Sequence, residues 1–216
     1  MIWLDPTQLE FPPSQLSDSD GCLAVGGDLN PERLLLAYRN GIFPWYNEGE
    51  PILWWTPDPR CVLFPEKLIV SDSMRSLLKK DKFEFRFNTS FSLVMQHCQS
   101  VKRADQDGTW IQDEMILAYQ ALHEQGYAIS GECWENGELV GGLYGVWLKD
   151  VFFGESMFHQ KTNASKFAFI KTIEHLKSNG LKLIDCQQPT HHLISLGAEL
   201  IPRHHFEDLL RAWIGK

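Results

Sequence analysis

The sequence predicts an α/β (α+β) protein, with a main domain (residues 61–216) built on a mixed, largely antiparallel sheet and a small N-terminal domain (residues 1–60) before it. Three observations support this fold class. Residues 83–88 alternate between Phe and polar side chains, which is typical of a half-buried strand. Asn136-Gly137 joins two apolar runs and indicates a hairpin turn. From residue 83 the elements follow the order β-α-α-β-β-β-α-β-α-β, a succession that favours an α/β arrangement.

The composition of the 216 residues limits the partners and cofactors to be expected. The net charge is −8, so a nucleic-acid partner would have to meet a local basic patch. Five cysteines without Cys-x-x-Cys spacing favour reduced thiols in the cytosol over a disulfide framework or a zinc module. No secretion signal or long apolar span is visible, so we expect a soluble protein without a membrane partner or a metal.

The small domain contains one clear helix signal. Residues 1–20 are rich in Pro, Ser and Asp, which predicts an irregular arm. Asn30 suits the N-cap of a helix, Pro31 its first position and Gly41 its C-terminal cap. Residues 42–60 interleave aromatic residues with prolines, which predicts a rigid platform without regular structure. This platform is either a small satellite core or a stacking surface for a base or an apolar ligand.

Periodicity and capping signals predict the elements of the main domain in order. They are a short helix at 73–80, a strand at 83–88, helices beginning near 91 and 113, strands at 128–134, 138–148 and 151–158, a helix after Asn163, a strand at 181–187, a short helix at 190–196, a strand at 199–201 and a helix at 204–214. Gly141-Gly142 is expected to mark a bulge or a close approach of two backbones instead of a phosphate loop.

Two predicted strands carry acids among apolar residues. In the strand 181–187, alternation places Asp185 and Gln187 on one face and Cys186 on the other. An unpaired buried carboxylate is costly, so Asp185 must be partnered or open on a cleft. In the strand 151–158, alternation places Glu155 on one face with Phe153 and Met157, and puts Phe152 and Phe158 on the other. Two acids on neighbouring strands repel unless a cation lies between them, either an internal Arg or Lys or a cationic substrate.

The order of elements is similar to the acetyltransferase-type (GNAT) fold, in which the fourth and fifth strands diverge and open a substrate slot. On this mapping the fourth strand carries Glu155 and the fifth carries Asp185. Members that bind acetyl-CoA hold its pyrophosphate with an Arg/Gln-x-x-Gly-x-Gly/Ala turn. The corresponding turn, Gln160 to Ser165, has neither glycine. We therefore expect no CoA cofactor and a different acyl donor.

A set of motifs that spans nearly the whole chain resembles leucyl/phenylalanyl-tRNA–protein transferase. The motifs are Gly26-Gly27-Asp28-Leu29, Gly41-Ile42-Phe43-Pro44-Trp45, Ile52-Leu53-Trp54-Trp55, Pro57-Asp58-Pro59-Arg60, Gly108-Thr109-Trp110-Ile111, Gly154-Glu155-Ser156-Met157-Phe158, Asn163-Ala164-Ser165-Lys166 and Leu183-Ile184-Asp185-Cys186-Gln187. The resemblance implies a bacterial cytoplasmic enzyme, monomeric and without a cofactor, that moves Leu or Phe from aminoacyl-tRNA onto proteins with N-terminal Arg or Lys. Its products would enter the N-degron pathway of protein degradation.

The resemblance also implies roles for the acids. It places Glu155 beside the cationic side chain of the acceptor, and Asp185 and Gln187 beside the reacting amine. A neutral amide is a weak base, so we assign Asp185 an electrostatic role and Gln187 an orienting hydrogen bond. The ribose hydroxyl of the donor is a further candidate for the proton step. Thr190 stands near these groups, at a position where some family members carry Asn.

Binding residues for the donor can be suggested, each with a structural alternative. Candidates for a dry pocket around the Leu or Phe side chain, which ordinary core packing explains as well, are Leu143, Phe152, Met157 and Ile184. Positions that match the terminal-adenosine site of the family are Trp45, Trp110 and Tyr119, with Tyr38 as a polar contact. The densest basic cluster, which is either a contact for the tRNA acceptor stem or a solvated helix face, is Arg75, Lys79, Lys80 and Lys82.

Two other functions, a second enzyme activity and a non-catalytic binder, compete with aminoacyl transfer. CoA-dependent acetyl transfer is disfavoured by the missing glycines, and a binder of tRNA ends or basic N-termini that has lost turnover remains open. A Cys186 nucleophile is not expected, because that side chain points away from Asp185. The paired histidines, His191-His192 and His204-His205, diverge on helix or loop and match no metal-site spacing.

Overall fold

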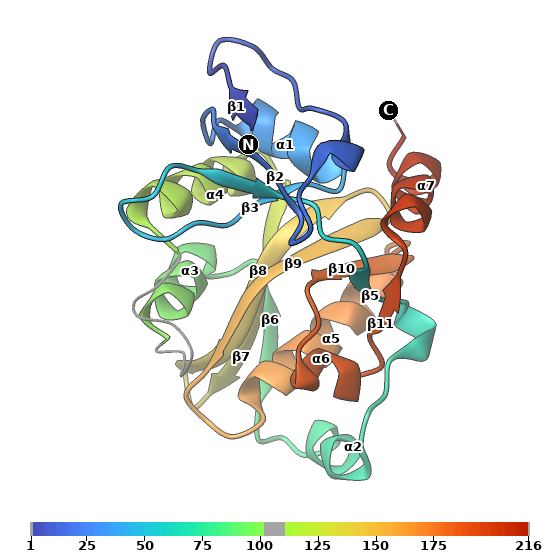
Figure 1. Cartoon of the computed structure of the whole chain (residues 1–216). Coiled ribbons are helices and arrows are strands. Elements are labelled where there is room, and N and C mark those ends of the chain that lie inside the picture. Colours follow the sequence, from blue (N-terminus) through green and yellow to red (C-terminus); the bar gives the residue numbers. More distant parts are fainter. Residues whose placement is uncertain (1, 102–110, 216) are drawn as a thin grey trace.

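The computed structural model describes residues 2–101 and 111–215, and the larger of its two sheets is a seven-stranded mixed sheet (Figure 1). The strand order is β11-β5-β10-β9-β8-β7-β6, in which β10 pairs with β9 in parallel and the other neighbours are antiparallel. The strands are β5 (Arg60–Leu63), β6 (Glu84–Phe87), β7 (Ala128–Glu135), β8 (Glu138–Leu148), β9 (Val151–His159), β10 (Leu183–Gln187) and β11 (Glu199–Ile201). The predicted fold class is confirmed, although β5 was not predicted.

Helices cover both faces of this sheet (Figure 1). Helix α5 packs on one face, while α3 and α4 cover the other and contribute to a different hydrophobic cluster. The helices are α1 (Pro31–Arg39), α2 (Asp72–Leu78), α3 (Phe91–Ser100), α4 (Asp113–Glu124), α5 (Ala164–Lys177), α6 (His191–Ser195) and α7 (Arg203–Trp213), with 3-10 turns η1 (Ser14–Leu16) and η2 (Pro65–Lys67). The predicted helices agree with these to within a few residues.

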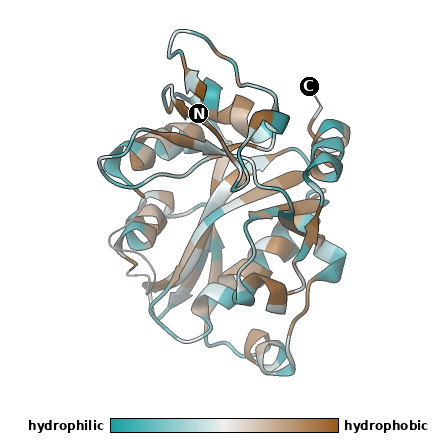
Figure 2. Cartoon of the chain, viewed as in Figure 1, coloured by the Kyte–Doolittle hydropathy of each residue, from teal (hydrophilic) through white to brown (hydrophobic). Residues whose placement is uncertain are grey.

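Local signals placed the helix ends correctly. Gly41 follows α1 with a φ of 71°, a left-handed conformation that suits the end of a helix. Thr190 caps α6, because its hydroxyl accepts a hydrogen bond from the Leu193 amide at 3.1 Å. Gly141 is confirmed as a close approach of backbones, since a Cβ there would lie 2.8 Å from the backbone carbonyl carbon of Ala164 at the start of α5. Apolar residues concentrate along the large sheet and the inward helix faces (Figure 2).

A second, four-stranded sheet, which the sequence did not lead us to expect, forms near the N-terminus. Its strands are β1 (Ile2–Leu4), β2 (Cys22–Gly26), β3 (Phe43–Pro44) and β4 (Leu53–Trp55), in the order β1-β2-β4-β3. The irregular arm predicted for residues 1–20 is wrong at its start, because β1 pairs with β2 in parallel. The platform predicted for residues 42–60 is also partly regular, because β3 pairs with β4. Three of these strands, β1, β3 and β4, are only two or three residues long, which is too short for alternation to be visible.

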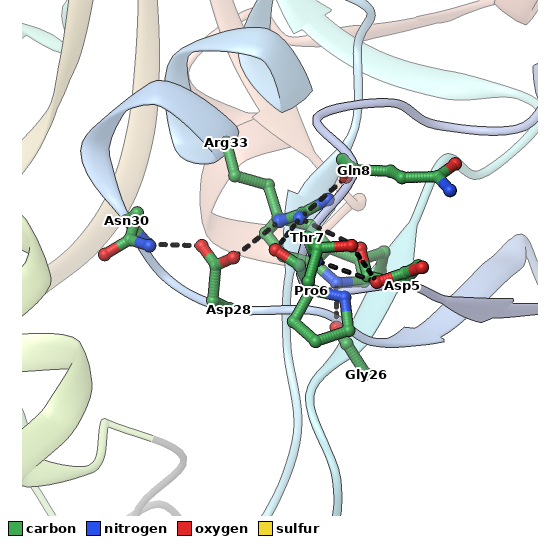
Figure 3. Close-up of polar contacts among 9 residues, drawn as sticks. Asp5, Pro6, Thr7, Gln8, Gly26, Asp28, Asn30 and Arg33 are labelled. Atoms are coloured by element: carbon green, nitrogen blue, oxygen red, sulfur yellow. Dashed lines mark hydrogen bonds and ion pairs between the residues drawn. The ribbon is translucent and has the colours of Figure 1, made fainter.

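A buried arginine fixes the N-terminal arm against α1 (Figure 3). The side chain of Arg33 is 2% exposed, and its Nε donates to Asp28 Oδ2 at 3.2 Å. Its Nη2 donates to the backbone carbonyls of Asp5, Pro6 and Gln8 at 3.3, 3.2 and 2.9 Å. The arm is therefore ordered by contacts to its backbone, which a pattern of side chains does not reveal.

The predicted domain division at residue 60 stays a prediction. The strands of the smaller sheet lie before this residue and those of the larger sheet begin at it. One hydrophobic cluster nevertheless combines Leu34 and Trp54 from the N-terminal part with Val146 and Phe153 from the large sheet. Within residues 2–101 and 111–215, no helix is long and apolar enough to cross a membrane.

Glu132 is a buried acid of β7 with a structural role. Its Oε1 accepts hydrogen bonds from the amides of Thr89 and Ser90 at 2.8 and 2.7 Å, where α3 begins, and from the Ser130 hydroxyl at 2.9 Å. Its Oε2 accepts from the Trp134 indole at 3.0 Å and from the Thr89 hydroxyl. The carboxylate thus joins the N-terminus of α3 to the sheet.

We expect Glu132→Gln to lower the free energy of unfolding by about 2 kcal/mol, because the amide nitrogen would leave the buried Trp134 N–H without an acceptor. Urea unfolding followed by tryptophan fluorescence measures this change. Glu84→Gln is the matched control, since Glu84 is exposed on β6 and pairs with Arg86 at the surface. Equal unfolding midpoints for both variants would contradict the structural role of Glu132.

Candidate active site

A cavity opens where β9 and β10 diverge. The two strands pair in parallel over Val151–Phe153 and Leu183–Asp185 and then separate. The space beyond the last pair has a volume of about 430 Å³, which is within the usual range for small-molecule sites. Its apolar lining includes Phe43, Leu143, Met157, Phe169, Ile184 and Leu193, and its polar lining includes Glu155, Gln187, Thr190 and His192.

Glu155 is the extra residue of a β-bulge in β9. Tyr144 of β8 pairs with Ser156 and the next residue, Gly145, pairs with Gly154, so Glu155 has no partner in the ladder. Its Oε1 accepts hydrogen bonds from the Tyr38 hydroxyl at 2.7 Å and from Gln187 Nε2 at 2.9 Å.

The Tyr119 hydroxyl lies 3.1 Å from Oε2 of Glu155 and contacts the Tyr38 hydroxyl. Burial raises the pKa of the Glu155 carboxyl to about 7, although the hydrogen bonds from Tyr38 and Tyr119 act in the opposite direction. The site therefore holds an acid that can carry a proton near neutral pH.

The bulge corrects the predicted faces of β9. Alternation placed Phe153 and Met157 on one face, opposite Phe152 and Phe158. In the structure Phe153 and Phe158 belong to the cluster beside α3 and α4, while Phe152 and Met157 belong to the cluster beside α5. One additional residue shifts the alternation by one position, so every side chain after Glu155 changes face.

An internal cation, Arg60 of β5, partners Asp185. Both side chains are at most 1% exposed, and the guanidinium donates from Nε to Oδ1 at 2.8 Å and from Nη2 to Oδ2 at 2.7 Å. The Arg60 Nη1 donates to the Gly41 carbonyl at 2.9 Å, and the guanidinium lies between the rings of Phe43 and Phe206, 4.9 and 4.7 Å from their centroids. Of the two kinds of cation considered for the pair of acids Glu155 and Asp185, the structure contains an internal one, and Arg60 is bonded to Asp185.

The sequence did not reveal this role of Arg60, although a signal was present. A carboxylate in a core strand needs either a buried cation or several hydrogen-bond donors, and Arg60 is a cation that directly precedes the short apolar run Cys61-Val62-Leu63. The residues lie 125 positions apart, so spacing along the chain does not identify the pair.

Gln187 reaches the cavity through a second irregularity. The pairing of β10 with β5 shifts between Asp185 and Gln187, and Gln187 has a φ of 60°. The expectation that regular alternation sets the faces of both residues is therefore wrong. The Gln187 amide donates to Asp185 Oδ1 at 2.9 Å, which fixes this turn, and its side chain then reaches Glu155. A continuous series of hydrogen bonds thus runs from Arg60 through Asp185 and Gln187 to Glu155.

Three of the four candidates for the donor pocket line the cavity, namely Leu143, Met157 and Ile184. Phe152 is 1% exposed and lies in the same hydrophobic cluster, but it is not among the lining residues. Its expected direct contact with the donor therefore stays a prediction, and its burial agrees with the alternative of ordinary core packing. Thr190 lines the cavity from the start of α6.

The aromatic candidates separate into two groups. Trp45 lines the cavity, and its ring contacts Trp55 at a centroid distance of 5.6 Å. Tyr38 and Tyr119 are fully buried, so neither ring has a free face and the expected stacking of Tyr119 on a base is corrected to a hydroxyl contact with Glu155. Trp110 lies outside the described residues.

The basic cluster lies on and after α2, at the bottom of the molecule in Figure 1. The four residues of the cluster are all exposed, namely Arg75, Lys79, Lys80 and Lys82. Arg75 donates to the Val70 carbonyl at 3.0 Å and lies 3.9 Å from Asp72, while Lys82 lies 3.9 Å from Glu135. These are weak surface pairs that leave the cluster accessible to a polyanion.

Several lining residues were not predicted. Phe43, Phe169 and Leu193 come from three separate elements, and their sequence neighbourhoods give no signal of a shared cavity. Burial lowers the pKa of His192, whose Nε2 is buried without a hydrogen-bond partner among the described residues.

The described residues bear on two further kinds of chemistry, metal binding and thiol catalysis. No group of three or more His, Cys, Asp or Glu side chains among them could hold a metal ion. Cys186 lines the cavity, but its contact with Cys61 and burial raise the pKa of its thiol well above the ordinary value. A thiol with a raised pKa is a poor nucleophile at neutral pH.

Sequence comparison finds matches over nearly the whole chain. Residues 62–211 match the family described as leucyl/phenylalanyl-tRNA protein transferase, and residues 27–58 match the N-terminal domain of that family. A leucyl/phenylalanyl-tRNA–protein transferase of Christiangramia forsetii is 56% identical over 212 residues, covering 97% of this chain and 100% of the relative. A protein of the same name from Pseudomonas aeruginosa PAO1 is 52% identical over 215 residues, covering 99% and 95%.

Solved structures give more distant matches. A GCN5-related N-acetyltransferase-like protein from Streptococcus suis aligns with a TM-score of 0.37 and 12% identity, covering 75% of this chain and 60% of the other. L-PGS from Bacillus licheniformis aligns with a TM-score of 0.40 and 12% identity, covering 75% and 50%.

Proposed function

Because the chain belongs to the leucyl/phenylalanyl-tRNA–protein transferase family, a family of aminoacyltransferases, we propose that it transfers Leu or Phe from aminoacyl-tRNA to proteins with N-terminal Arg or Lys. The family gives the reaction class, and the chemistry of the cavity supports the choice of donor and acceptor. We further propose, as the resemblance implies, that the enzyme acts as a cytoplasmic monomer without a cofactor and supplies the N-degron pathway.

The main observation that supports this proposal is that apolar side chains and an acid line the same cavity. Leu143, Met157 and Ile184 offer an apolar surface to a Leu or Phe side chain. Met is flexible and polarisable, which suits a pocket that accepts both an aliphatic and an aromatic guest. Glu155 lies in the same cavity and would attract a cationic N-terminal residue.

Transfer from this donor requires positioning more than chemical activation. The donor is an ester between the amino acid and a ribose oxygen, so the acceptor nitrogen attacks the carbonyl carbon directly. The carbon–oxygen bond to the ribose then breaks, the amine loses one proton, the ribose oxygen takes up one proton either directly from the amine or through solvent, and an amide remains. Holding the amine near the carbonyl supplies most of the acceleration in such a step. Trp45 and Trp110 are proposed to hold the terminal adenosine by stacking.

Gln187 and Asp185 would act on the amine in different ways. Since Gln187 Nε2 donates to Glu155, its side-chain oxygen is the atom that can accept a hydrogen bond from the amine. The charge of Asp185 is shared with Arg60. We therefore assign Asp185 the role of fixing the Gln187 backbone and contributing negative potential, in place of direct proton removal.

A direct transfer assay tests the proposal. The protein is mixed with Leu-tRNA and a peptide beginning with Arg, and mass spectrometry follows the addition of one leucine to the peptide. A matched peptide beginning with citrulline, which has the shape of Arg without its charge, should be modified much more slowly. Binding of both substrates without any mass shift would indicate a binder that has lost turnover and would overturn the proposal.

The basic cluster makes a separate prediction about salt. If Lys79 and Lys80 contact tRNA phosphates, the double variant Lys79→Ala/Lys80→Ala should bind Leu-tRNA more weakly, and the slope of log affinity against log salt should fall by about one for each phosphate that is no longer neutralised. Filter binding at several salt concentrations measures both effects. Lys177→Ala is the control, because Lys177 is an exposed lysine at the end of α5. Unchanged salt slopes would identify the cluster as an ordinary solvated face.

A further inference from the structure

Three oxygen contacts form a closed ring between Tyr38, Tyr119 and Glu155. The Tyr38 hydroxyl lies 2.7 Å from Glu155 Oε1, the Tyr119 hydroxyl lies 3.1 Å from Oε2, and the two hydroxyls contact each other. Each contact needs one proton between its two oxygens, because two oxygens that face each other with lone pairs alone repel. The ring as a whole therefore needs three protons.

Counting protons shows which form of Glu155 satisfies the ring. Each tyrosine supplies one hydroxyl proton, so an ionised Glu155 leaves one of the three contacts without a proton. A neutral Glu155 supplies the third. Its Oε1 already accepts from Tyr38 and from Gln187 at 2.7 and 2.9 Å, so the carboxyl proton belongs on Oε2. Oε2 then donates to Tyr119, Tyr119 donates to Tyr38, and Tyr38 donates to Oε1.

The surroundings of the ring also favour its neutral form. Tyr38 of α1 and Tyr119 of α4 are fully buried, and burial raises the pKa of both hydroxyls well above the ordinary value, so neither supplies a charge. Tyr144 of β8 packs against Tyr119 with ring centroids 5.6 Å apart. The negative charge of Asp185 on β10 raises the pKa of Glu155, and the positive charge of Arg60 on β5 is directed at Asp185.

We propose that Glu155 is a neutral carboxylic acid in the free protein, that Tyr38 and Tyr119 hold its proton in the ring, and that a cationic acceptor binds by displacing this proton. The second half of the proposal rests on the proposed function, whereas the first half concerns the protein alone. The exchange is balanced: the carboxylic acid loses one proton to solvent, and the carboxylate that remains pairs with the guanidinium or ammonium of the acceptor.

This exchange makes the ring a determinant of acceptor specificity. An uncharged N-terminal side chain meets a neutral acid whose proton is already engaged with Tyr119, and it gains no ionic contact. A cation stabilises the carboxylate through charge-assisted hydrogen bonds and so compensates for the missing hydrogen bond in the ring. Acceptor binding should therefore strengthen as the pH rises through about 7, where Glu155 loses its proton.

The first experiment uses the free protein and Glu155→Gln, whose amide N–H₂ replaces the carboxyl proton donor. The folded protein keeps the Glu155 proton up to a pKa of about 7, while the unfolded chain loses it near 4.5. The stabilisation that this proton gives the folded state is therefore complete below pH 4.5 and is lost as the pH rises through 7. Between pH 5 and 8 the unfolding constant of the wild type should rise relative to the variant by a factor on the order of 50.

Glu174→Gln, which changes an exposed glutamate paired with Lys171, should follow the wild type and serves as control. Parallel pH curves for the wild type and Glu155→Gln would overturn the neutral acid. Should Glu155→Gln fail to fold, infrared titration of the wild type decides the question. A protonated carboxyl band that persists at pH 6 and disappears by pH 8 supports the ring, and its absence at pH 6 refutes it.

The second experiment tests displacement by the acceptor. Calorimetry of a peptide beginning with Arg, in two buffers of different ionisation enthalpy at pH 6, counts the protons released on binding. The wild type should release close to one proton more than Glu155→Gln, and the same peptide beginning with citrulline should release none from this site. Equal release by both proteins would overturn the displacement. A peptide that binds neither protein would contradict the proposed function and leave the pH curves of the free protein to decide the protonation.

Discussion

Asp185→Ala is expected to lower the free energy of unfolding by about 3–5 kcal/mol and to abolish aminoacyl transfer. The stability loss follows from Arg60, whose guanidinium would remain buried without the carboxylate to which it donates two hydrogen bonds. The loss of transfer follows from Gln187, whose turn is fixed by its amide bond to Asp185 Oδ1. Urea unfolding measures the first effect, and the rate of leucine addition to an Arg peptide measures the second.

A double variant separates the two effects. Replacement of a buried ion pair by apolar residues of similar volume is often neutral for stability. Arg60→Met/Asp185→Leu should therefore recover most of the stability that Asp185→Ala loses, while transfer should remain abolished because Gln187 is still released. If the double variant transferred leucine at the wild-type rate, the pair would be structural only. If Asp185→Ala unfolded at the wild-type urea concentration, the buried pair would not exist in solution.

The sequence predicted what depends on local signals. The Asn136-Gly137 hairpin, the start of α6 after Thr190 and the end of α1 at Gly41 are each determined by a few neighbouring residues, and each lies where it was predicted. Strands β7, β8 and β9 of the large sheet, with eight to eleven residues each, are long enough for a strand pattern to be read. The strands near the N-terminus are not, and their pairing depends on contacts such as those of Arg33 with a distant backbone.

The site is less predictable because its geometry depends on two exceptions to alternation. The bulge at Glu155 changes the face of the residues that follow, and the turn at Gln187 redirects its side chain toward Glu155. The bulge lies beside the glycine pair Gly145 and Gly154, but the turn at Gln187 has no glycine or proline at its centre that would mark it in the sequence. The partner of Asp185 is likewise set by the pairing of β5 with β10, which brings together residues 125 positions apart.

The hydrogen bonds and ring contacts of Arg60 link the cavity to the rest of the fold. Arg60 bonds to the Gly41 carbonyl after α1, and its guanidinium packs between Phe43 of β3 and Phe206 of α7. Phe43 is in turn part of the cavity lining. One guanidinium therefore holds the N-terminal part, the C-terminal helix and the acid of β10 in a fixed relation, which is the rigidity that a reaction based on positioning requires.

The donor pocket can be tested by filling it. Met157 is partly exposed in the cavity wall, so Met157→Trp should extend a ring into the cavity with little strain in the core. Single methylene groups in such pockets change rates by about 10- to 200-fold, so a whole ring should reduce transfer of Phe by at least about a hundredfold. Leu, which is smaller, should be affected less. Competition between Leu-tRNA and Phe-tRNA for one Arg peptide measures the change in preference.

Leu200→Trp provides the matched control for this variant, since Leu200 is 48% exposed on the edge strand β11 and is not among the cavity lining residues. It adds the same ring and should transfer both amino acids at wild-type rates. The acceptor side offers a second check, because Met157→Trp leaves Glu155 in place and an Arg peptide should still bind. A Met157→Trp variant that kept the wild-type preference would place the donor side chain elsewhere, since a ring of this size in a cavity of about 430 Å³ has to compete with an aromatic guest.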